Sequence, residues 1–146
     1  MVDEEAVTIA IGADHAGYPL KQALLETVLK GYDVIDLGTD STASVDYPDI
    51  ARRVATVVAA GKADKGILIC GTGIGMSIAA GKVRGIRAAR CTEPFSAELS
   101  RRHNDANILC LGARITGVEL ASRTVEVWLN TPFEGGRHAR RVGKIE

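Results

Sequence analysis

The chain has 146 residues, of which 46% are hydrophobic, and it carries 18 lysines and arginines against 18 aspartates and glutamates. This length and apolar content predict one domain over residues 1–146, and folding of such a chain buries roughly 68–70% of its unfolded surface. The balanced charge excludes a global positive field that would attract nucleic acid or an anionic membrane, so any recognition of an anion must be local.

The apolar runs and the cysteines favour a cytoplasmic protein. No apolar run approaches the roughly 18 residues of a membrane span, and the first residues, MVDEEAV, are acidic where a secretory signal would be basic. Cys70, Cys91 and Cys110 are odd in number and lack CxxC spacing, so we expect free thiols and neither a disulfide framework nor a structural zinc site.

Strands and helices are expected to alternate along the chain. The short apolar segments typical of buried strands are residues 7–14, 32–38, 65–71, 85–91 and 106–113. The segments with apolar residues at helical spacing are residues 19–30, 48–61, 92–104 and 116–130, and a helix of small residues follows the third strand. This order predicts an α/β fold with a doubly wound, five-stranded parallel sheet, Rossmann-like, of strand order 2-1-3-4-5. A helical tail over residues 131–146 would follow the last strand and helix.

Several polar residues at helix ends and on helix faces have expected roles. Thr92 is placed to cap the helix of residues 92–104, and Thr116 and Glu119 have capping-box spacing at the start of the last helix. The arginines expected on solvated helix faces are Arg52, Arg53, Arg101 and Arg102.

Residues with useful chemistry follow the carboxyl ends of three predicted strands. Asp14 and His15 follow the first strand, Cys70 ends the third, and Arg114 follows the fifth. Ligands of doubly wound sheets bind beyond these ends, where the strand order reverses between strands 1 and 3. We therefore expect an acid, an imidazole, a thiol and a guanidinium to meet at one rim.

The glycine-rich loop after the third strand does not match the common nucleotide motifs. From Gly71 it reads GxGxG with Met76 in the sixth place, whereas a dinucleotide fingerprint needs GxGxxG, and no acid ends the fourth strand. Residues 75–83, GMSIAAGKV, also lack the spacing and the GK[ST] ending of a P-loop. The loop can instead present backbone N–H groups to a negative oxygen at a helix N-terminus, which also stabilises a thiolate at Cys70.

Five strings, in the same order along nearly the whole chain, resemble the type B ribose-5-phosphate isomerases, of the family that includes the galactose-6-phosphate isomerase subunits. They are GADHAG (12–17), DYPDIA (46–51), ICGTGIGMSIAAGK (69–82), RRHNDANILCLGAR (101–114) and PFEGGRHARRV (132–142). The third string has Gly81 where the family motif has asparagine.

The resemblance implies an aldose–ketose isomerase that interconverts ribose 5-phosphate and ribulose 5-phosphate, a step of the pentose phosphate pathway. The reaction passes through an enediolate and uses no metal and no organic cofactor. Two alternatives stay open at this point. The substrate could be a six-carbon sugar phosphate such as allose 6-phosphate or galactose 6-phosphate, or the chain could be a non-catalytic module that binds a nucleotide or phosphate, because a fold alone does not determine a function.

The resemblance also implies which residues carry the chemistry. Cys70 would be the base that moves a proton between C1 and C2. The backbone that would hold the enediolate oxygens comprises Gly71, Thr72, Gly73, Ile74 and Gly75. A subgroup without the cysteine carries a glutamate base at the position of Met76, and methionine cannot accept a proton, so the chain resembles the cysteine type.

Other residues are implied in ring opening, binding and assembly. His103 would open the sugar ring, assisted by Asp14 and Thr72, and which of the three transfers the proton is open. The implied binding residues are Asp14, His15, Tyr47, Asn104, Arg114, Arg137, His138 and Arg141, with phosphate on His15 and the tail arginines. The tail would reach into the neighbouring subunit's site, which implies a homodimer with shared active sites, and a pairing of two dimers into a tetramer stays open.

Overall fold

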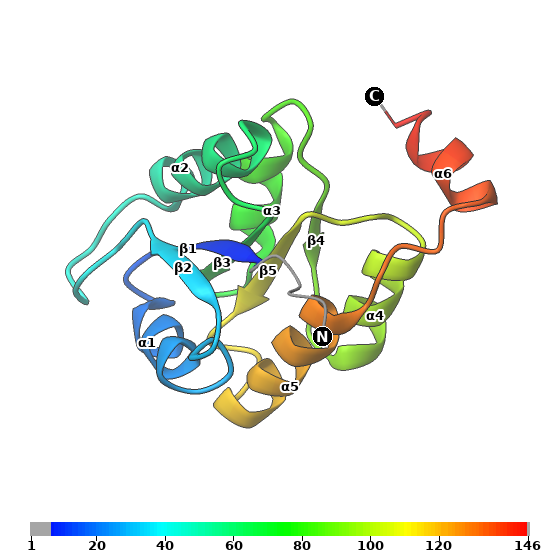
Figure 1. Ribbon diagram of the computed structural model, residues 1–146. Helices are drawn as coiled ribbons and strands as arrows, with labels where there is room; N and C mark the ends of the chain where they lie inside the picture. Colours follow the sequence, from blue (N-terminus) through cyan, green and yellow to red (C-terminus); the bar gives the residue numbers. More distant parts are fainter. Residues whose placement is uncertain (1–6, 146) are drawn as a thin grey trace.

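The computed structural model describes residues 7–145, coloured along the chain in Figure 1. The strands are β1 (Thr8–Ala13), β2 (Asp33–Asp36), β3 (Lys65–Cys70), β4 (Ala88–Arg90) and β5 (Ile108–Gly112). The helices are α1 (Tyr18–Glu26), α2 (Tyr47–Ala59), α3 (Ile74–Gly81), α4 (Pro94–Arg102), α5 (Val118–Asn130) and α6 (Arg137–Val142). All strand pairs are parallel, which confirms the predicted α/β fold class.

The predicted order of the last two strands was wrong. The sheet order is β2-β1-β3-β5-β4, so β5 and not β4 lies beside β3. All five residues of β5 are buried, whereas β4 has three residues, of which Arg90 is exposed. A fully apolar strand gains most from a central place, and a short strand flanked by arginines suits the sheet edge. The reversal of strand order between β1 and β3 remains as expected.

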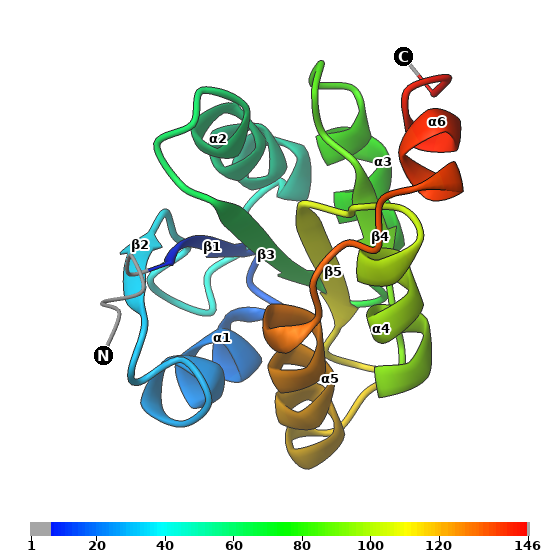
Figure 2. The same ribbon diagram turned by 45° about the vertical axis from the view of Figure 1, so that its right-hand side comes forward.

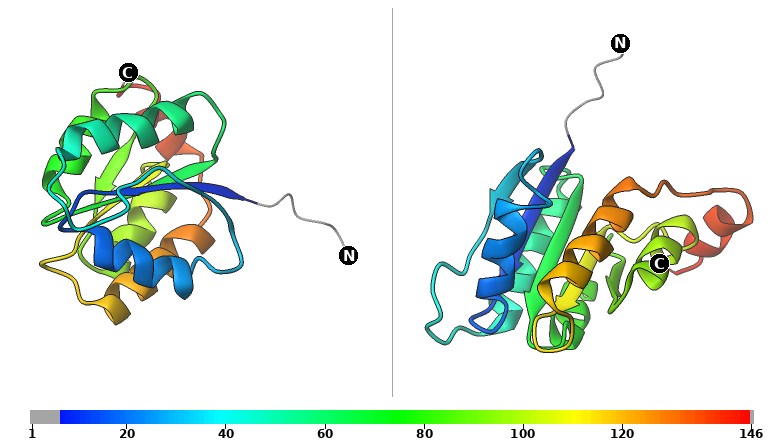
Figure 3. Two further views of the ribbon diagram at one scale, coloured as in Figure 1. Left: turned by 90° about the vertical axis from the view of Figure 1, so that its left-hand side faces the viewer. Right: turned by 90° about the horizontal axis from the view of Figure 1, so that it is seen from below.

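Helices cover both faces of the sheet, as seen edge-on in Figure 3. One core contains β-strand side chains such as Ile11 and Leu109 packed against Leu24 of α1, Ala97 of α4 and Trp128 of α5. The other core lies under α2 and α3, and its large side chains include Ile50, Val54, Leu68, Met76 and Ile108. Because both faces are buried, the central strands are nearly continuous apolar runs.

The helix caps differ from those predicted. Glu93, not Thr92, is the N-cap of α4, and its carboxylate accepts hydrogen bonds from the N–H groups of Phe95 and Ser96 at 2.6 and 2.9 Å. The N-cap of α5 is Gly117, and no side chain caps this helix. The predicted capping box was therefore wrong: the hydroxyl of Thr116 points instead to the carbonyl oxygen of Thr92, 3.5 Å away.

One of the four arginines predicted on solvated faces is buried. Arg101 is 7% exposed, and its guanidinium donates to the carbonyl oxygens of Thr131 and Ala106 and to the carboxylate of Asp105. It thus joins the end of α4 to the beginning of the tail. Arg52 and Arg53 are exposed, as expected, and Arg102 is half-buried.

The tail contains the expected helix, α6, which places Arg137 and Arg141 one turn apart. Figure 2 shows α6 standing beyond α4, outside the layers that cover the sheet. The N–H of Glu134 donates to the carbonyl oxygen of Arg102 at 3.1 Å, which anchors the chain before α6 to the end of α4. Among residues 7–145, no helix is long and apolar enough to cross a membrane.

Candidate active site

The predicted base and its loop line a pocket of about 450 Å³ at the carboxyl edge of the sheet. We call it the thiol pocket. Its lining residues are Asp14, Tyr47, Cys70, Gly71, Thr72, Ile74, Gly75, Ile78 and Arg114. The pocket thus brings together a carboxylate, a thiol and a guanidinium from the ends of β1, β3 and β5. The exchange of β4 and β5 explains the place of Arg114: Gly112 of β5 pairs with Cys70 of β3, and the N–H of Arg114 donates to the carbonyl oxygen of Gly71 at 3.0 Å.

The glycine loop holds the sulfur of Cys70. The backbone N–H of Gly73 donates to Cys70 Sγ at 3.1 Å, and Gly73 has a φ of 81°, which glycine adopts without strain. Gly73 is also the N-cap of α3, and the first N–H groups of an α-helix have no acceptor within the helix. These N–H groups and the positive end of the helix dipole stabilise negative charge at the loop, on a thiolate or on a substrate oxygen.

The loop is fitted closely to its neighbours. A Cβ on Gly75 would come 2.5 Å from the ring of Tyr47, and one on Gly112 would come 2.6 Å from the backbone of Thr72. The side chain of Arg90 donates to the carbonyl oxygen of Thr72 at 3.0 Å. The backbone of the loop is therefore held in place from both sides, as an oxyanion site requires.

Asp14 and His15 occupy the turn after β1. The carboxylate of the buried Asp14 accepts from the N–H of Gly17 at 3.0 Å and still faces the thiol pocket. His15 does not line that pocket. Its Nδ1 accepts from the N–H of Val45 at 3.2 Å, so in the neutral imidazole Nε2 carries the proton and can donate to an anionic oxygen.

The predicted acid and the tail residues line a second pocket of about 340 Å³, which we call the tail pocket. Its lining residues are His103, Asn104, His138, Arg141, Val142 and Ile145. The imidazoles of His103 and His138 are stacked, with ring centroids 4.2 Å apart and planes 9° from parallel. Arg137 begins α6 and is exposed, outside the lining of either pocket.

The two pockets lie at opposite ends of the strands: the thiol pocket at their carboxyl ends, which we call the carboxyl edge, and the tail pocket at their amino ends, the amino edge. Cys70 ends β3, whereas His103 follows the end of α4, and the N–H of Ala106, just before β5 begins, donates to Ser100 of that helix. The helices that link parallel strands run back against them, so α4 ends at the amino edge. Strands rise about 3.3 Å per residue, which puts the two edges on the order of 15 Å apart. One chain therefore does not bring the predicted base and the predicted acid together.

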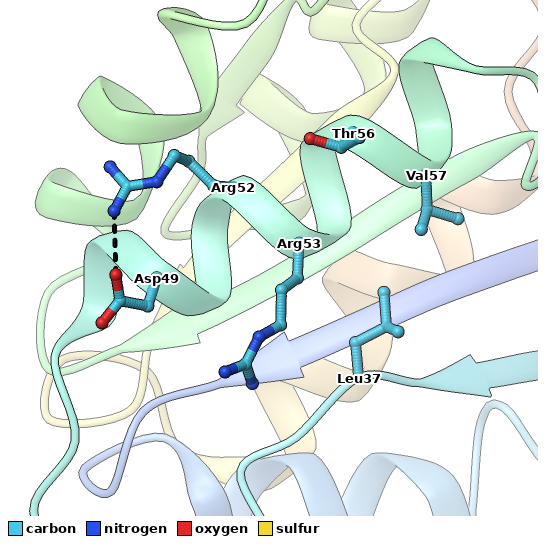
Figure 4. A pocket seen from close by; sticks show the side chains of 6 residues that line it. All are labelled: Leu37, Asp49, Arg52, Arg53, Thr56 and Val57. Atoms are coloured by element: carbon cyan, nitrogen blue, oxygen red, sulfur yellow. Dashed lines mark hydrogen bonds and ion pairs between the residues drawn. The ribbon is translucent and has the colours of Figure 1, made fainter.

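A third hollow, of about 520 Å³, lies on the outer side of α2 (Figure 4). It is lined by Leu37, Asp49, Arg52, Arg53, Thr56 and Val57. Arg52 is tied to Asp49 at 2.8 Å, and none of the lining side chains is a thiol or an imidazole. The carboxylate of Asp49 is engaged by Arg52, so we do not assign the active site to this hollow.

Three residues near the two pockets are missing from the predicted set. Ile78 lines the thiol pocket one helical turn after Ile74, a spacing that could have identified it. Arg90, at the end of β4, supports the loop. The expected strand order gave no reason to place this residue among the site residues. Glu134 lies 3.5 Å from His138 Nε2, and its i, i+4 spacing to His138 was a readable signal.

The remaining cysteines differ from Cys70 in their surroundings. All three cysteines are buried free thiols, but only Cys70 lines the thiol pocket, and Cys91 and Cys110 line neither the thiol pocket nor the tail pocket. Burial raises the pKa of the Cys91 and Cys110 thiols, which favours the protonated form. Neither thiol is therefore suited to act as a base at neutral pH.

Comparison with known proteins identifies the family. The profile described as Ribose/Galactose Isomerase matches residues 9–145. The chain belongs to this isomerase family. Among curated members of the ribose/galactose isomerase family, ribose-5-phosphate isomerase B of Escherichia coli is 54% identical over 94% of this chain and 93% of its own. D-erythrulose-4-phosphate isomerase of Pectobacterium atrosepticum is 46% identical over 95% of this chain and 93% of its own.

Solved structures of ribose/galactose isomerases have the same fold. Ribose-5-phosphate isomerase B of Clostridium thermocellum superposes with a TM-score of 0.93 at 56% identity, covering 95% of each chain. The enzyme of Mycoplasma genitalium, solved with bound ribulose-5-phosphate, gives 0.92 at 42% identity over 97% of this chain and 95% of its own. Membership in this family favours an enzyme that acts on sugar phosphates over a module that binds nucleotides.

Proposed function

We propose that this chain is a ribose-5-phosphate isomerase that interconverts ribose 5-phosphate and ribulose 5-phosphate, with Cys70 as the base. The observation that carries the proposal is the sulfur of Cys70 at 3.1 Å from the Gly73 N–H, in a pocket that also contains Asp14 and Arg114. A thiolate at this place can take the proton from C2 of the open-chain aldose and return it to C1. The loop N–H groups are placed to stabilise the enediolate oxygens that form between these two steps.

We assign the remaining roles by resemblance to the family. His103, with its imidazole at the tail pocket, opens the sugar ring, and Asp14 and Thr72 assist from the thiol pocket. Tyr47 lines the sugar. The residues assigned to the phosphate and its neighbouring oxygens are His15, Asn104, Arg114, Arg137, His138 and Arg141. Of these, Arg114 lines the thiol pocket, and Asn104, His138 and Arg141 line the tail pocket. A guanidinium fork matches two oxygens of a phosphate dianion, which supports the assignment to the arginines.

We further propose that the working enzyme is a homodimer in which the tail pocket of one chain completes the thiol pocket of the other. Within one chain the two pockets face opposite edges of the sheet, so a site that needs both must be assembled from two copies. The exposed apolar side chains beside the thiol pocket support this arrangement: Ile74 is 47%, Ile78 60% and Tyr47 40% exposed. Contiguous exposed apolar residues at a pocket are typical of an interface.

The cytoplasm suits this proposal. The three cysteines are unpaired, and free thiols persist in reducing compartments.

Sugar phosphates of other chain lengths are competing candidates for the substrate. The matching family is described as acting on ribose or galactose, and one relative acts, by its name, on D-erythrulose 4-phosphate. We therefore expect measurable but lower kcat/KM for allose 6-phosphate, galactose 6-phosphate and erythrulose 4-phosphate than for ribose 5-phosphate. A higher kcat/KM for any of these would assign that sugar as the substrate while leaving the isomerisation chemistry intact.

A direct assay tests the reaction and the base together. Purified protein is incubated with ribose 5-phosphate and the formation of ribulose 5-phosphate is followed, in parallel with Cys70→Ala and with the matched control Cys91→Ala. We expect Cys70→Ala to lose nearly all turnover and Cys91→Ala to retain most of it. Equal turnover in Cys70→Ala and the unmodified chain would remove Cys70 from the mechanism, and absence of turnover in the unmodified chain on every sugar would reject the proposed function.

A further inference from the structure

At the tail pocket, two histidines that carry roles in the proposed reaction lie beside Glu134, which has no role in it. His103, Glu134 and His138 each offer one ligand atom, and these atoms all lie within 4.8 Å of one another. Two imidazoles and a carboxylate form a ligand set typical of zinc sites that keep a position open for water. Zn²⁺ binds such atoms at about 2.0–2.2 Å, which sets them roughly 3.4 Å apart, so small side-chain rotations would close the site.

His138 is the strongest sign that this group takes a ligand. The residue is 7% exposed, and its Nε2 is buried without a hydrogen-bond partner among the described residues. The Glu134 carboxylate lies 3.5 Å from Nε2, which is close enough for an electrostatic contact but does not form a hydrogen bond.

Glu134 is already oriented for this role. Its Oε2 lies 3.6 Å from the guanidinium of Arg102, which leaves Oε1 facing His138. Arg102 is itself held by Glu98 at 2.7 Å, and the Glu134 N–H is bonded to the Arg102 carbonyl oxygen. Such outer contacts fix the direction of a ligating carboxylate. The adjoining tail pocket of about 340 Å³ gives a metal a path of entry and room for a bound water.

We propose that His103, Glu134 and His138 form a binding site for Zn²⁺ whose occupation inhibits the isomerase. The inhibitory part rests on the proposed function, because metal on the imidazole of His103 would prevent that ring from transferring the proton that opens the sugar. The ligands select borderline metals such as Zn²⁺, Co²⁺ and Ni²⁺ over Mg²⁺ and Ca²⁺. Arg102, Arg137 and Arg141 oppose a cation, so the site is reversible and not a permanent structural centre.

The binding arm of the test needs no substrate. Cys70→Ala serves as the background, since a thiolate would itself bind zinc. Titration calorimetry with Zn²⁺ and the visible spectrum with Co²⁺ are compared between this background, the same background with Glu134→Gln, and a matched control with Glu98→Gln. We expect one metal per chain, no heat with Mg²⁺, at least tenfold weaker binding in Glu134→Gln, and less than threefold weakening in Glu98→Gln, which removes an equal charge beside Arg102 but no ligand.

The activity arm uses chains with Cys70 intact. We expect Zn²⁺ to inhibit ribose 5-phosphate turnover, EDTA to restore it, and Glu134→Gln to raise the inhibitory concentration at least tenfold relative to its own metal-free rate. Inhibition that Glu134→Gln leaves unchanged would assign the effect to Cys70 and overturn the inhibitory role. Absence of zinc binding in the Cys70→Ala background, or equal weakening by Glu134→Gln and Glu98→Gln, would overturn the site itself, whether or not the chain is an isomerase.

Discussion

At the scale of single residues, the three cysteines show how surroundings decide reactivity. Cys70 ends β3 at the thiol pocket and accepts an N–H from the start of α3. Cys110 lies inside the fully buried β5, and Cys91 follows β4 in the core beneath α4 and α5. Because burial raises the pKa of the Cys91 and Cys110 thiols, both stay protonated at neutral pH, and only the thiolate is the nucleophile.

We therefore expect selective alkylation of Cys70. On limited treatment with iodoacetamide at pH 7.5, peptide mass spectrometry should find the label on Cys70 first, with loss of turnover in proportion to labelling, and ribose 5-phosphate should slow both. Cys91 and Cys110 should react only after denaturation. Labelling of either at the rate of Cys70 in the folded protein would contradict this account of the three thiols.

At the scale of elements, the loop between β3 and α3 depends on one left-handed residue. Gly73 has a φ of 81°, and a Cβ there would come 3.0 Å from the Leu111 carbonyl carbon. Gly61, after α2, has a similar φ of 76° but open space around it and lies away from both pockets. A side chain at either position would therefore carry the same conformational penalty. Only Gly73 also donates its N–H to Cys70, the proposed base.

This pair gives a controlled test of the loop. We expect Gly61→Ala to cost about 1–2 kcal/mol of stability, the penalty for a left-handed residue, with kcat unchanged. Gly73→Ala keeps its backbone N–H, but the added Cβ would shift the loop and move this N–H away from Cys70. This variant should therefore lose at least that stability and also lower kcat by about 100-fold or more, as loss of an oxyanion donor does. Urea unfolding and steady-state kinetics measure the two quantities. A kcat in folded Gly73→Ala close to that of Gly61→Ala would show that the loop N–H does not assist the base.

Arg101 and Arg102 offer a second comparison, at the junction of α4 and the tail. Removal of Arg101, whose guanidinium donates to two carbonyl oxygens and to Asp105, should destabilise the fold by about 3 kcal/mol in Arg101→Met. Arg102→Met breaks only partly exposed ion pairs and should cost at most about 1 kcal/mol. The free energies of unfolding in urea decide the point, and equal losses in the two variants would contradict the buried role of Arg101.

Element type was predictable from the sequence, and the errors have physical causes. Buried strands and amphipathic helices carry their own apolar period, so segments such as residues 65–71 and 48–61 were placed correctly. The order of β4 and β5 depends on which strand is buried on both faces. The arginines around β4 indicate an edge strand, and the predicted order did not take them into account. The burial of Arg101 depends on carbonyl oxygens contributed by the tail, 30 residues away at Thr131, which no local pattern reveals.

At the scale of the whole molecule, the predicted site falls into two halves. The residues after β1, β3 and β5 meet at one edge because all strands are parallel, which the alternation of elements made predictable. By contrast, the order of the motifs along the sequence does not show whether His103 and Cys70 lie at the same edge of the sheet. The geometry of α4 answers this: the helix carries the chain back to the amino edge, so His103 is far from the Cys70 of its own chain.

We propose that each active site combines Cys70 of one chain with His103 of another, and mixed dimers provide the test of this arrangement. Cys70→Ala and His103→Gln chains with different affinity tags are produced together, and dimers bearing both tags are isolated. Each variant alone should be nearly inactive, whereas the mixed dimer has one intact site and should show about half the ribose 5-phosphate turnover of the unmodified dimer. A mixed dimer as inactive as its parents would mean that base and acid act within one chain, contradicting the account.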